Sequence, residues 1–164
     1  MTLTREELTT YILEIIPEIT ALRHELHRYP ELAGSEHRTR AMIKERCDAL
    51  APIYWQAKLG TDLVFEIPGR DPGRVTGLRA DIDALPLSEE TGLEYASRNE
   101  GIMHACGHDG HASLLCGAAM IADRFRKYLP HTIRFIFQPG EEEVCMGAQL
   151  VEEGVCDGLS DVYS

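Results

Sequence analysis

Residues 109–137 read DGHASLLCGAAMIADRFRKYLPHTIRFIF, and they contain the two patterns that set the fold class. Apolar residues recur at spacings of three and four over 109–126, as on one face of a helix. The stretch 132–137 is mostly branched and aromatic, which predicts a strand buried on both faces, as in a parallel sheet covered by helices. A helix followed by a buried strand predicts a layered α/β fold.

The alternation continues on both sides of this stretch. Helical spacing predicts helices over Arg5–Arg28 and 36–50, and β-favouring runs predict strands over 53–55, Leu63–Ile67 and 75–78. A short helix around 147–153 and a strand beginning near Asp161 follow. The whole pattern predicts a mostly parallel sheet between helices.

Composition fits one packed domain and excludes several classes of protein. Of the 164 residues, 44% are hydrophobic and 26% are charged, which argues against disorder and coiled coils. The net charge of −11 argues against nucleic acid as a partner. The chain has neither an apolar run of about 18 residues nor a secretion signal, so we expect no membrane association and a cytoplasmic location. Five irregularly spaced cysteines favour free thiols over a disulfide framework.

Chemically active side chains collect where two predicted strands end. The strand 75–78 leads into RADID (79–83), and the strand 132–137 leads into QPGEEE (138–143). Between them, residues 104–111 read HACGHDGH, directly before the long helix. Because the carboxyl ends of parallel strands meet at one sheet edge, we expect these groups to lie close together.

A metal site explains this collection. Clustered carboxylates repel one another unless a cation compensates their charge. Imidazole, thiolate and carboxylate together suit zinc, manganese, cobalt or nickel, whereas calcium and magnesium sites are built from oxygen. Cys106 and His108 lie two residues apart, and a tight turn at Gly107 lets them converge on one centre. A thiolate at Cys106 is able to bridge two ions.

The three consecutive glutamates are expected to have different roles, one in metal binding and another in proton transfer. Adjacent side chains in an extended segment point to opposite sides, so all three cannot coordinate one ion. One carboxylate holds the ion, and its neighbour acts as general base for a water molecule that attacks a carbonyl. The pattern therefore indicates metal-assisted amide hydrolysis.

Each of these features has a plainer alternative. Cys106 could be a small buried thiol. Glu141 to Glu143 could form a solvated helix N-terminus. Asp81 and Asp83 could be turn formers before Pro86.

The other histidines carry no second signal for metal binding. We treat His104 as a polar loop residue, and His111 as a first-turn helical residue or a hydrogen-bond partner. Arg23, His24 and His27 are expected to be surface or inter-helix polar groups.

Four motifs resemble, in order and spacing, those of the M20 metallopeptidase family. They are LRHELHRYPEL (22–32), LRADIDALP (78–86), MHACGHDGH (103–111) and FQPGEEE (137–143). The most similar branch is that of the amidohydrolases, which includes aminoacylases, hippurate hydrolases and auxin-conjugate hydrolases. The resemblance implies a three-layer, zinc-peptidase-like α/β catalytic domain with two divalent transition-metal ions. It also implies a small-molecule substrate, an N-acyl or N-aroyl amino acid whose amide bond is hydrolysed.

The same resemblance assigns roles to individual residues. It implies that Cys106 is a bridging ligand, that His108 and Glu142 are metal ligands, and that Glu141 is the general base. Asp83 stands where other branches place an aspartate that orients a metal-binding histidine, and we count it with the catalytic residues.

Chain length is the main departure from the family. M20 members are more than twice as long, so we expect residues 1–164 to be the N-terminal part of the catalytic domain. The lid and dimerisation domain and the C-terminal part are then absent, and homodimers belong to the full-length protein. Such a fragment should bind metal weakly and be inactive or nearly so.

Two other functions remain open. The chain could be a non-catalytic metal- or partner-binding fragment of a split or truncated gene product. It could also be a cysteine hydrolase, with Cys106 as nucleophile and His108 or His111 as base.

Overall fold

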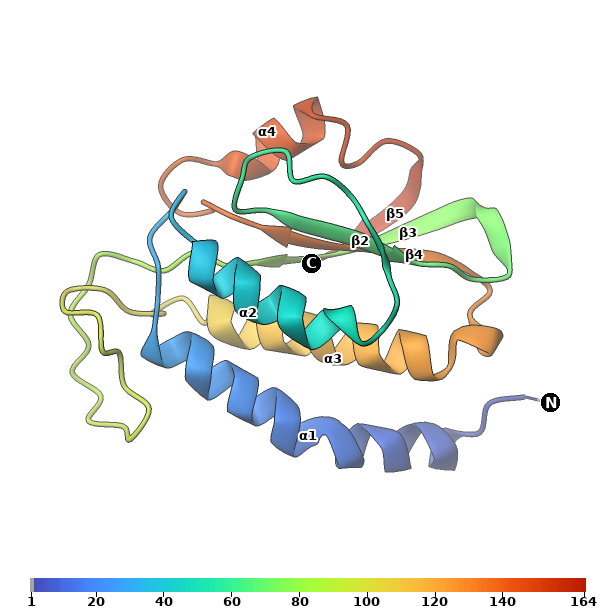
Figure 1. Cartoon of the computed structure of the whole chain (residues 1–164), viewed down its shortest axis with the longest axis horizontal. Coiled ribbons are helices and arrows are strands. Elements are labelled where there is room, and N and C mark those ends of the chain that lie inside the picture. The colour runs from blue at the N-terminus through green and yellow to red at the C-terminus, as the bar shows by residue number, and fades with distance from the viewer. Residues whose placement is uncertain (1) are drawn as a thin grey trace.

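The computed structural model describes residues 2–164 and shows helices on both faces of a five-stranded sheet (Figure 1). Three helices, α1, α2 and α3, lie on one face, and the short helix α4 lies on the other (Figure 1). The layered α/β fold expected from the sequence is therefore confirmed. In chain order the elements are α1 (Arg5–Arg28), α2 (His37–Asp48), β1 (Ile53–Tyr54), β2 (Leu63–Ile67), β3 (Asp71–Asp81), α3 (His108–Arg124), the 3₁₀ turn η1 (Arg126–Tyr128), β4 (His131–Gln138), α4 (Met146–Glu152) and β5 (Leu159–Tyr163).

The sheet has the strand order β1-β2-β4-β3-β5. It is mixed and not, as expected, mostly parallel, because two of the four pairings among the described strands are antiparallel. The strand β3 runs parallel to both of its neighbours, β4 and β5, as the alternation of helices and strands predicts. At the other side of the sheet, β2 is antiparallel to β4 and β1 is antiparallel to β2. The parallel part is the part that delivers its strand ends to the candidate site.

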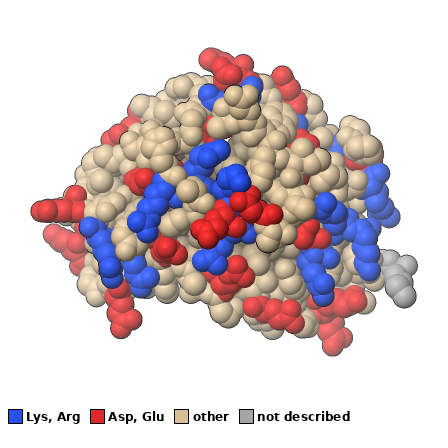
Figure 2. Space-filling model, in the orientation of Figure 1, with Lys and Arg blue, Asp and Glu red and all other residues tan. Residues whose placement is uncertain are grey.

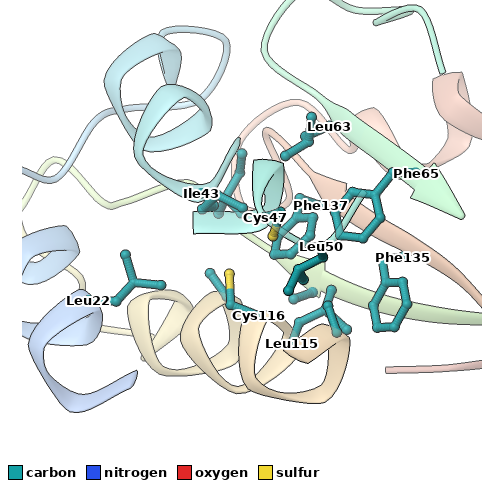
Figure 3. Close-up of a cluster of buried hydrophobic side chains, with 14 of the residues drawn as sticks. Leu22, Ile43, Cys47, Leu50, Leu63, Phe65, Leu115, Cys116, Phe135 and Phe137 are labelled. Carbon is teal, nitrogen blue, oxygen red and sulfur yellow. The ribbon is translucent and has the colours of Figure 1, made fainter. Parts of the chain in front are cut away.

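The core explains why both faces of the central strands are apolar. Side chains alternate between the two faces of a strand. Phe65 of β2 and Phe135 and Phe137 of β4 face the three-helix layer, where they meet residues such as Leu22, Ile43 and Leu115 (Figure 3). The rings of Phe65 and Phe135 stack with centroids 5.1 Å apart. On the other face, a smaller cluster packs under α4; it consists of Val64, Ile136, Leu150 and Val155.

The strand β3 extends further than its apolar pattern predicts. The pattern ends at Leu78, but parallel pairing with β4 continues to Asp81, which lies opposite Gln138. Asp81 is therefore a strand residue, and Asp83 beyond it is only 1% exposed. Neither residue lies in a turn, so the alternative in which these two aspartates are turn formers before Pro86 is wrong.

On the face seen in Figure 2, basic and acidic side chains are interspersed. Within residues 2–164, no helix has the length and apolar composition that crossing a membrane requires.

Candidate metal centre

The candidate site lies at the carboxyl ends of β3 and β4, beside the first turn of α3. Gly107 immediately precedes α3 and has φ +81° and ψ 16°, the left-handed conformation that glycine adopts most readily. Cys106 and His108 lie on either side of it. The tight turn that their spacing predicts is thus present.

Three side chains converge at this turn. Cys106, His108 and Glu142 each offer one ligand atom, and these atoms all lie within 4.8 Å of one another. His108 Nε2 is 3.7 Å from Glu142 Oε1. The His108 side chain is 6% exposed and that of Glu142 is 28% exposed, while Cys106 is an exposed residue. The group is therefore anchored in the protein on one side and open to solvent on the other.

Asp83 ties two members of this group together. Its Oδ1 is 3.1 Å from His108 Nδ1, and its Oδ2 accepts a hydrogen bond of 3.0 Å from the backbone N–H of Glu142. Its backbone oxygen is also 3.0 Å from His108 Nδ1. These acceptors keep hydrogen on Nδ1 and turn Nε2 toward the other ligands, which is the arrangement that commonly supports a metal-binding histidine.

Electrostatics around Asp83 and His108 favour their charged forms. Burial alone raises the pKa of Asp83, but hydrogen bonds from His108 and from the backbone of Glu142 and Glu141 outweigh it and lower the pKa. Burial alone lowers the pKa of His108, but the hydrogen bond with Asp83 and the charges of Asp81 and Asp83 outweigh it and raise the pKa.

Cys106 does not have the properties of an activated nucleophile. A hydrogen bond to Glu142, burial and the nearby carboxylates raise the pKa of its thiol to about 11. Reactive cysteines instead have a lowered pKa, from a histidine, a lysine or a helix N-terminus. The geometry therefore disfavours the cysteine-hydrolase alternative. Three carboxylates around a thiol are what a bound cation would compensate.

A second group of potential ligands shares His108. Ligand atoms of Asp81, His108 and His111 lie within 4.8 Å of one another, and His111 Nδ1 is 2.7 Å from Asp81 Oδ1. The sequence alone does not predict either Asp81 or His111 as a ligand. The signal was available, because His111 lies three residues after His108 on one helix, and such residues share a face.

The two groups differ in how free their carboxylates are. Asp81 Oδ2 is already 2.9 Å from Arg79 Nη1, whereas Glu142 has no lysine or arginine partner among the described residues, and its only ion-pair partner there is His108. His108 Nε2 faces both groups, at 3.6 Å from Asp81 and 3.7 Å from Glu142. One imidazole nitrogen has one lone pair, so His108 serves one ion at a time.

The glutamates lie in a turn and not in the extended segment that we expected. This turn precedes α4, which begins only at Met146, so the helix N-terminus alternative is also wrong. Glu142 joins the ligand group, while Glu141 lies in neither group and acts on Cys106 through its charge. The fully buried Glu36 holds the turn, because its Oε1 accepts a 2.9 Å hydrogen bond from Gly140 N–H.

His104 is buried and belongs to neither ligand group. It is 5% exposed, and its two ring nitrogens have no hydrogen-bond partner within residues 2–164. Burial lowers its pKa to about 4. His104 lies in the irregular segment before α3, as expected of a loop residue, but it is buried there.

Comparison with known proteins places this arrangement in a family. Residues 77–163 match the model of peptidase family M20/M25/M40. The chain belongs to this family. The resemblance drawn from the four motifs is thereby confirmed.

Two curated relatives and one solved structure show how far the likeness extends. An N-acyl-L-amino acid amidohydrolase of Geobacillus stearothermophilus is 39% identical over 98% of this chain and 44% of its own length. An N-acetyl-L-cysteine deacetylase of Bacillus subtilis is 39% identical over 99% of this chain and 39% of its own length. A Bacillus subtilis dinuclear metal-binding M20 peptidase superposes with a TM-score of 0.86 at 39% identity, over 89% of this chain and 41% of its own. The chain thus spans about two fifths of its relatives' length.

Proposed function

We propose that this chain is the N-terminal part of a metal-dependent amidohydrolase that cleaves the amide bond of N-acyl or N-aroyl amino acids. Two relatives at 39% identity are named for the hydrolysis of such substrates. The observation that carries the proposal is the convergence of Cys106, His108 and Glu142 within 4.8 Å. The activity of a whole enzyme is inferred, because the chain spans only part of these relatives.

The donor set fits a divalent transition metal. A thiolate, an imidazole and a carboxylate are ligands that zinc, manganese, cobalt or nickel accept, and Asp83 supplies the supporting hydrogen bond. A metal ion held by these residues would polarise the amide carbonyl and make a water molecule more acidic. Cys106, His108 and Glu142 would hold the ion, and His108 would serve one ion at a time.

Glu141 is the residue that we assign to proton transfer. It precedes the proposed ligand Glu142, lies outside both ligand groups, and its charge acts on the Cys106 thiol. It accepts the proton of the attacking water and delivers it to the amine as the amide bond breaks. Asp83 keeps His108 in place during both transfers.

The isolated chain should bind metal weakly and hydrolyse slowly at best. Its described residues offer three donors in each group, and the group around Cys106 is open to solvent. The same observation favours the alternative of a non-catalytic metal- or partner-binding fragment. Binding and turnover must therefore be measured separately.

The binding measurement is a calorimetric titration of the chain with Zn²⁺ and with Mn²⁺. We expect Cys106→Ser, His108→Ala and Glu142→Ala each to weaken binding by tenfold or more, because each removes a ligand. Glu143→Gln is the matched control, since it lies beside Glu142 and outside both ligand groups. Unchanged affinity in Glu142→Ala would contradict the proposed centre.

The turnover measurement follows amino acid release from N-acetyl and N-benzoyl amino acids with either metal present. The proposal expects slow release that Glu141→Gln abolishes while metal affinity stays the same. Metal binding without any release supports the non-catalytic alternative. Release that persists in Glu141→Gln contradicts the role assigned to Glu141.

A further inference from the structure

A long segment without regular structure leads into the candidate metal centre. Residues 82–107 connect β3 with α3, form no helix or named strand, and end at Cys106 and Gly107. Ordering such a segment costs conformational entropy, so something must anchor it if its last residues are to hold a ligand in place. Several of its anchors lead to the C-terminal turns of α1.

The central anchor is His27, near the C-terminal end of α1. Its Nδ1 is 2.9 Å from Asp109 Oδ2, and its Nε2 is 3.2 Å from Glu89 Oε1. The side chains of His27, Glu89 and Asp109 are 8%, 3% and 1% exposed. Both partners are carboxylates, so each ring nitrogen of His27 has a carboxylate oxygen within hydrogen-bond distance. Paired buried charges avoid the large cost of an isolated one.

Glu89 is in turn fixed by its own segment. Its Oε2 accepts a 2.6 Å hydrogen bond from the backbone N–H of Ser97, and its Oε1 accepts one from the Thr91 hydroxyl. Burial raises the pKa of Glu89, but the hydrogen bonds from Thr91, Ser97 and His27 outweigh burial and lower it. Glu89 is therefore ionised at neutral pH and holds several parts of the segment at once.

Asp109 carries the connection to the ligands. It follows His108 directly in the first turn of α3 and is 1% exposed. Its Oδ2 also lies 3.3 Å from Arg23 Nε of α1. Further contacts dock the segment on the same end of α1: Tyr95 stacks on His24 at 3.8 Å between centroids, and Arg98 N–H donates to Arg28 O at 2.9 Å.

We propose that Glu89, His27 and Asp109 form a positioning bridge that holds residues 104–108 in the geometry needed for metal binding. This inference rests on the metal centre proposed above. Glu89 and His27 contact no ligand side chain; they act through Asp109, which adjoins His108 in the chain. Ligands must be held to within about 0.5 Å for tight binding, and supporting residues of this kind commonly change metal affinity by about 10- to 100-fold.

The first test needs no metal. His27→Phe keeps an aromatic ring but removes both hydrogen bonds of the bridge. By amide hydrogen exchange, we expect residues 104–113 to exchange at least tenfold faster than in the native chain, beyond any change in β2 and β4. Ile67→Val, in the core at the far end of β2, is the matched control for a general loss of stability. Equal exchange over 104–113 in His27→Phe and the native chain overturns the proposal.

The second test is a Co²⁺ titration followed by the absorption band that a cysteine thiolate ligand produces. We expect His27→Phe and Glu89→Gln to weaken Co²⁺ binding by ten- to a hundredfold, and Ile67→Val to leave it unchanged. Native affinity in His27→Phe overturns the positioning bridge. If the native chain itself gives no band, the proposed metal centre fails, and the exchange measurement still decides whether the bridge orders residues 104–108.

Discussion

At the scale of single residues, metal binding at the candidate site depends on the proton of the Cys106 thiol, which a bound cation would displace. The pKa of the Cys106 thiol is raised to about 11, and the largest cause is its hydrogen bond with Glu142. Metal ligation requires the thiolate, so binding releases a proton and strengthens as pH rises. The exposed Cys106 thiol is therefore mostly protonated at neutral pH in the metal-free chain.

This leads to a prediction about alkylation of the metal-free chain. At pH 7.5 we expect Cys106 to react about 10- to 100-fold more slowly than an unperturbed thiol, because a pKa of about 11 in place of 9.0 removes most of its thiolate. Glu142→Gln should speed the reaction, since the side-chain amide of glutamine carries no negative charge. Mass spectrometry separates Cys106 from the exposed Cys145, which serves as the internal reference. If native Cys106 is alkylated as fast as Cys145, its thiol does not have the raised pKa.

The pair of Asp83 and His108 predicts a pH window for stability. Asp83 has a lowered pKa, so its contribution is present above its ordinary value of 3.8 and is lost as pH falls through the lowered one. His108 has a raised pKa, so its contribution is complete below its ordinary value of 6.5 and is lost as pH rises through the raised one. Both contributions are full only between these ordinary values.

We therefore expect Asp83→Asn to destabilise the metal-free chain most between about pH 4 and 6.5. The cost there should be about 2–4 kcal/mol, since the change leaves a buried partner unpaired. Urea unfolding from pH 3 to 9 measures it. The control is Asp48→Asn, which removes an exposed ion pair with Lys44. If the loss of unfolding free energy in Asp83→Asn grows steadily above pH 7, the pairing of Asp83 with a charged His108 is contradicted.

At the scale of elements, the structure depends on close approaches that composition does not reveal. Gly69 lies between β2 and β3, and a Cβ there would meet the backbone of His131, at 2.2 Å from its oxygen. Backbone atoms cannot move aside as a flexible side chain can. The packing of the β2–β3 connection against the start of β4 therefore requires glycine at this position for steric reasons, and not because of its φ.

Gly69→Ala should consequently destabilise the chain by about 2 kcal/mol or more, as other backbone clashes do. Gly73→Ala is the matched control, because a Cβ at Gly73 meets only Asp71 Oδ1 at 3.3 Å. We expect it to change the free energy of unfolding by less than about 1 kcal/mol. Chemical denaturation of both variants measures the difference, and equal losses would show that the clash is relieved elsewhere.

Elements with a regular period were predictable from sequence, and long-range contacts were not. The helix Arg5–Arg28 and the strand Leu63–Ile67 have the predicted bounds, because periodic apolar residues report their own burial. The extension of β3 to Asp81 depends on its partner β4. His27 gave no signal beyond a polar group between helices, because its partners Glu89 and Asp109 are 62 and 82 residues away.

At the scale of the whole molecule, a bound ion should stabilise the fold. A ligand that binds only the folded chain contributes about 2.7 kcal/mol at 100 times its dissociation constant. For a chain of this size we expect Zn²⁺ at that level to raise Tm by about 5–10 °C, and EDTA to reverse the change. Thermal unfolding of His108→Ala should show no such shift. An equal shift in that variant would mean that the ion binds elsewhere.

The left-handed turn at Gly107 sets the positions of the two proposed ligands beside it, Cys106 and His108. A Cβ at Gly107 would meet no atom within 4 Å, so alanine would change only the preference for the left-handed turn, by about 1–2 kcal/mol. If the chain relaxed out of that turn when free, each binding event would have to restore it. The same 1–2 kcal/mol would then appear as a roughly 5- to 30-fold weaker affinity with an unchanged ligand set. The conformational preference of one backbone residue would thus set the metal affinity of the proposed centre.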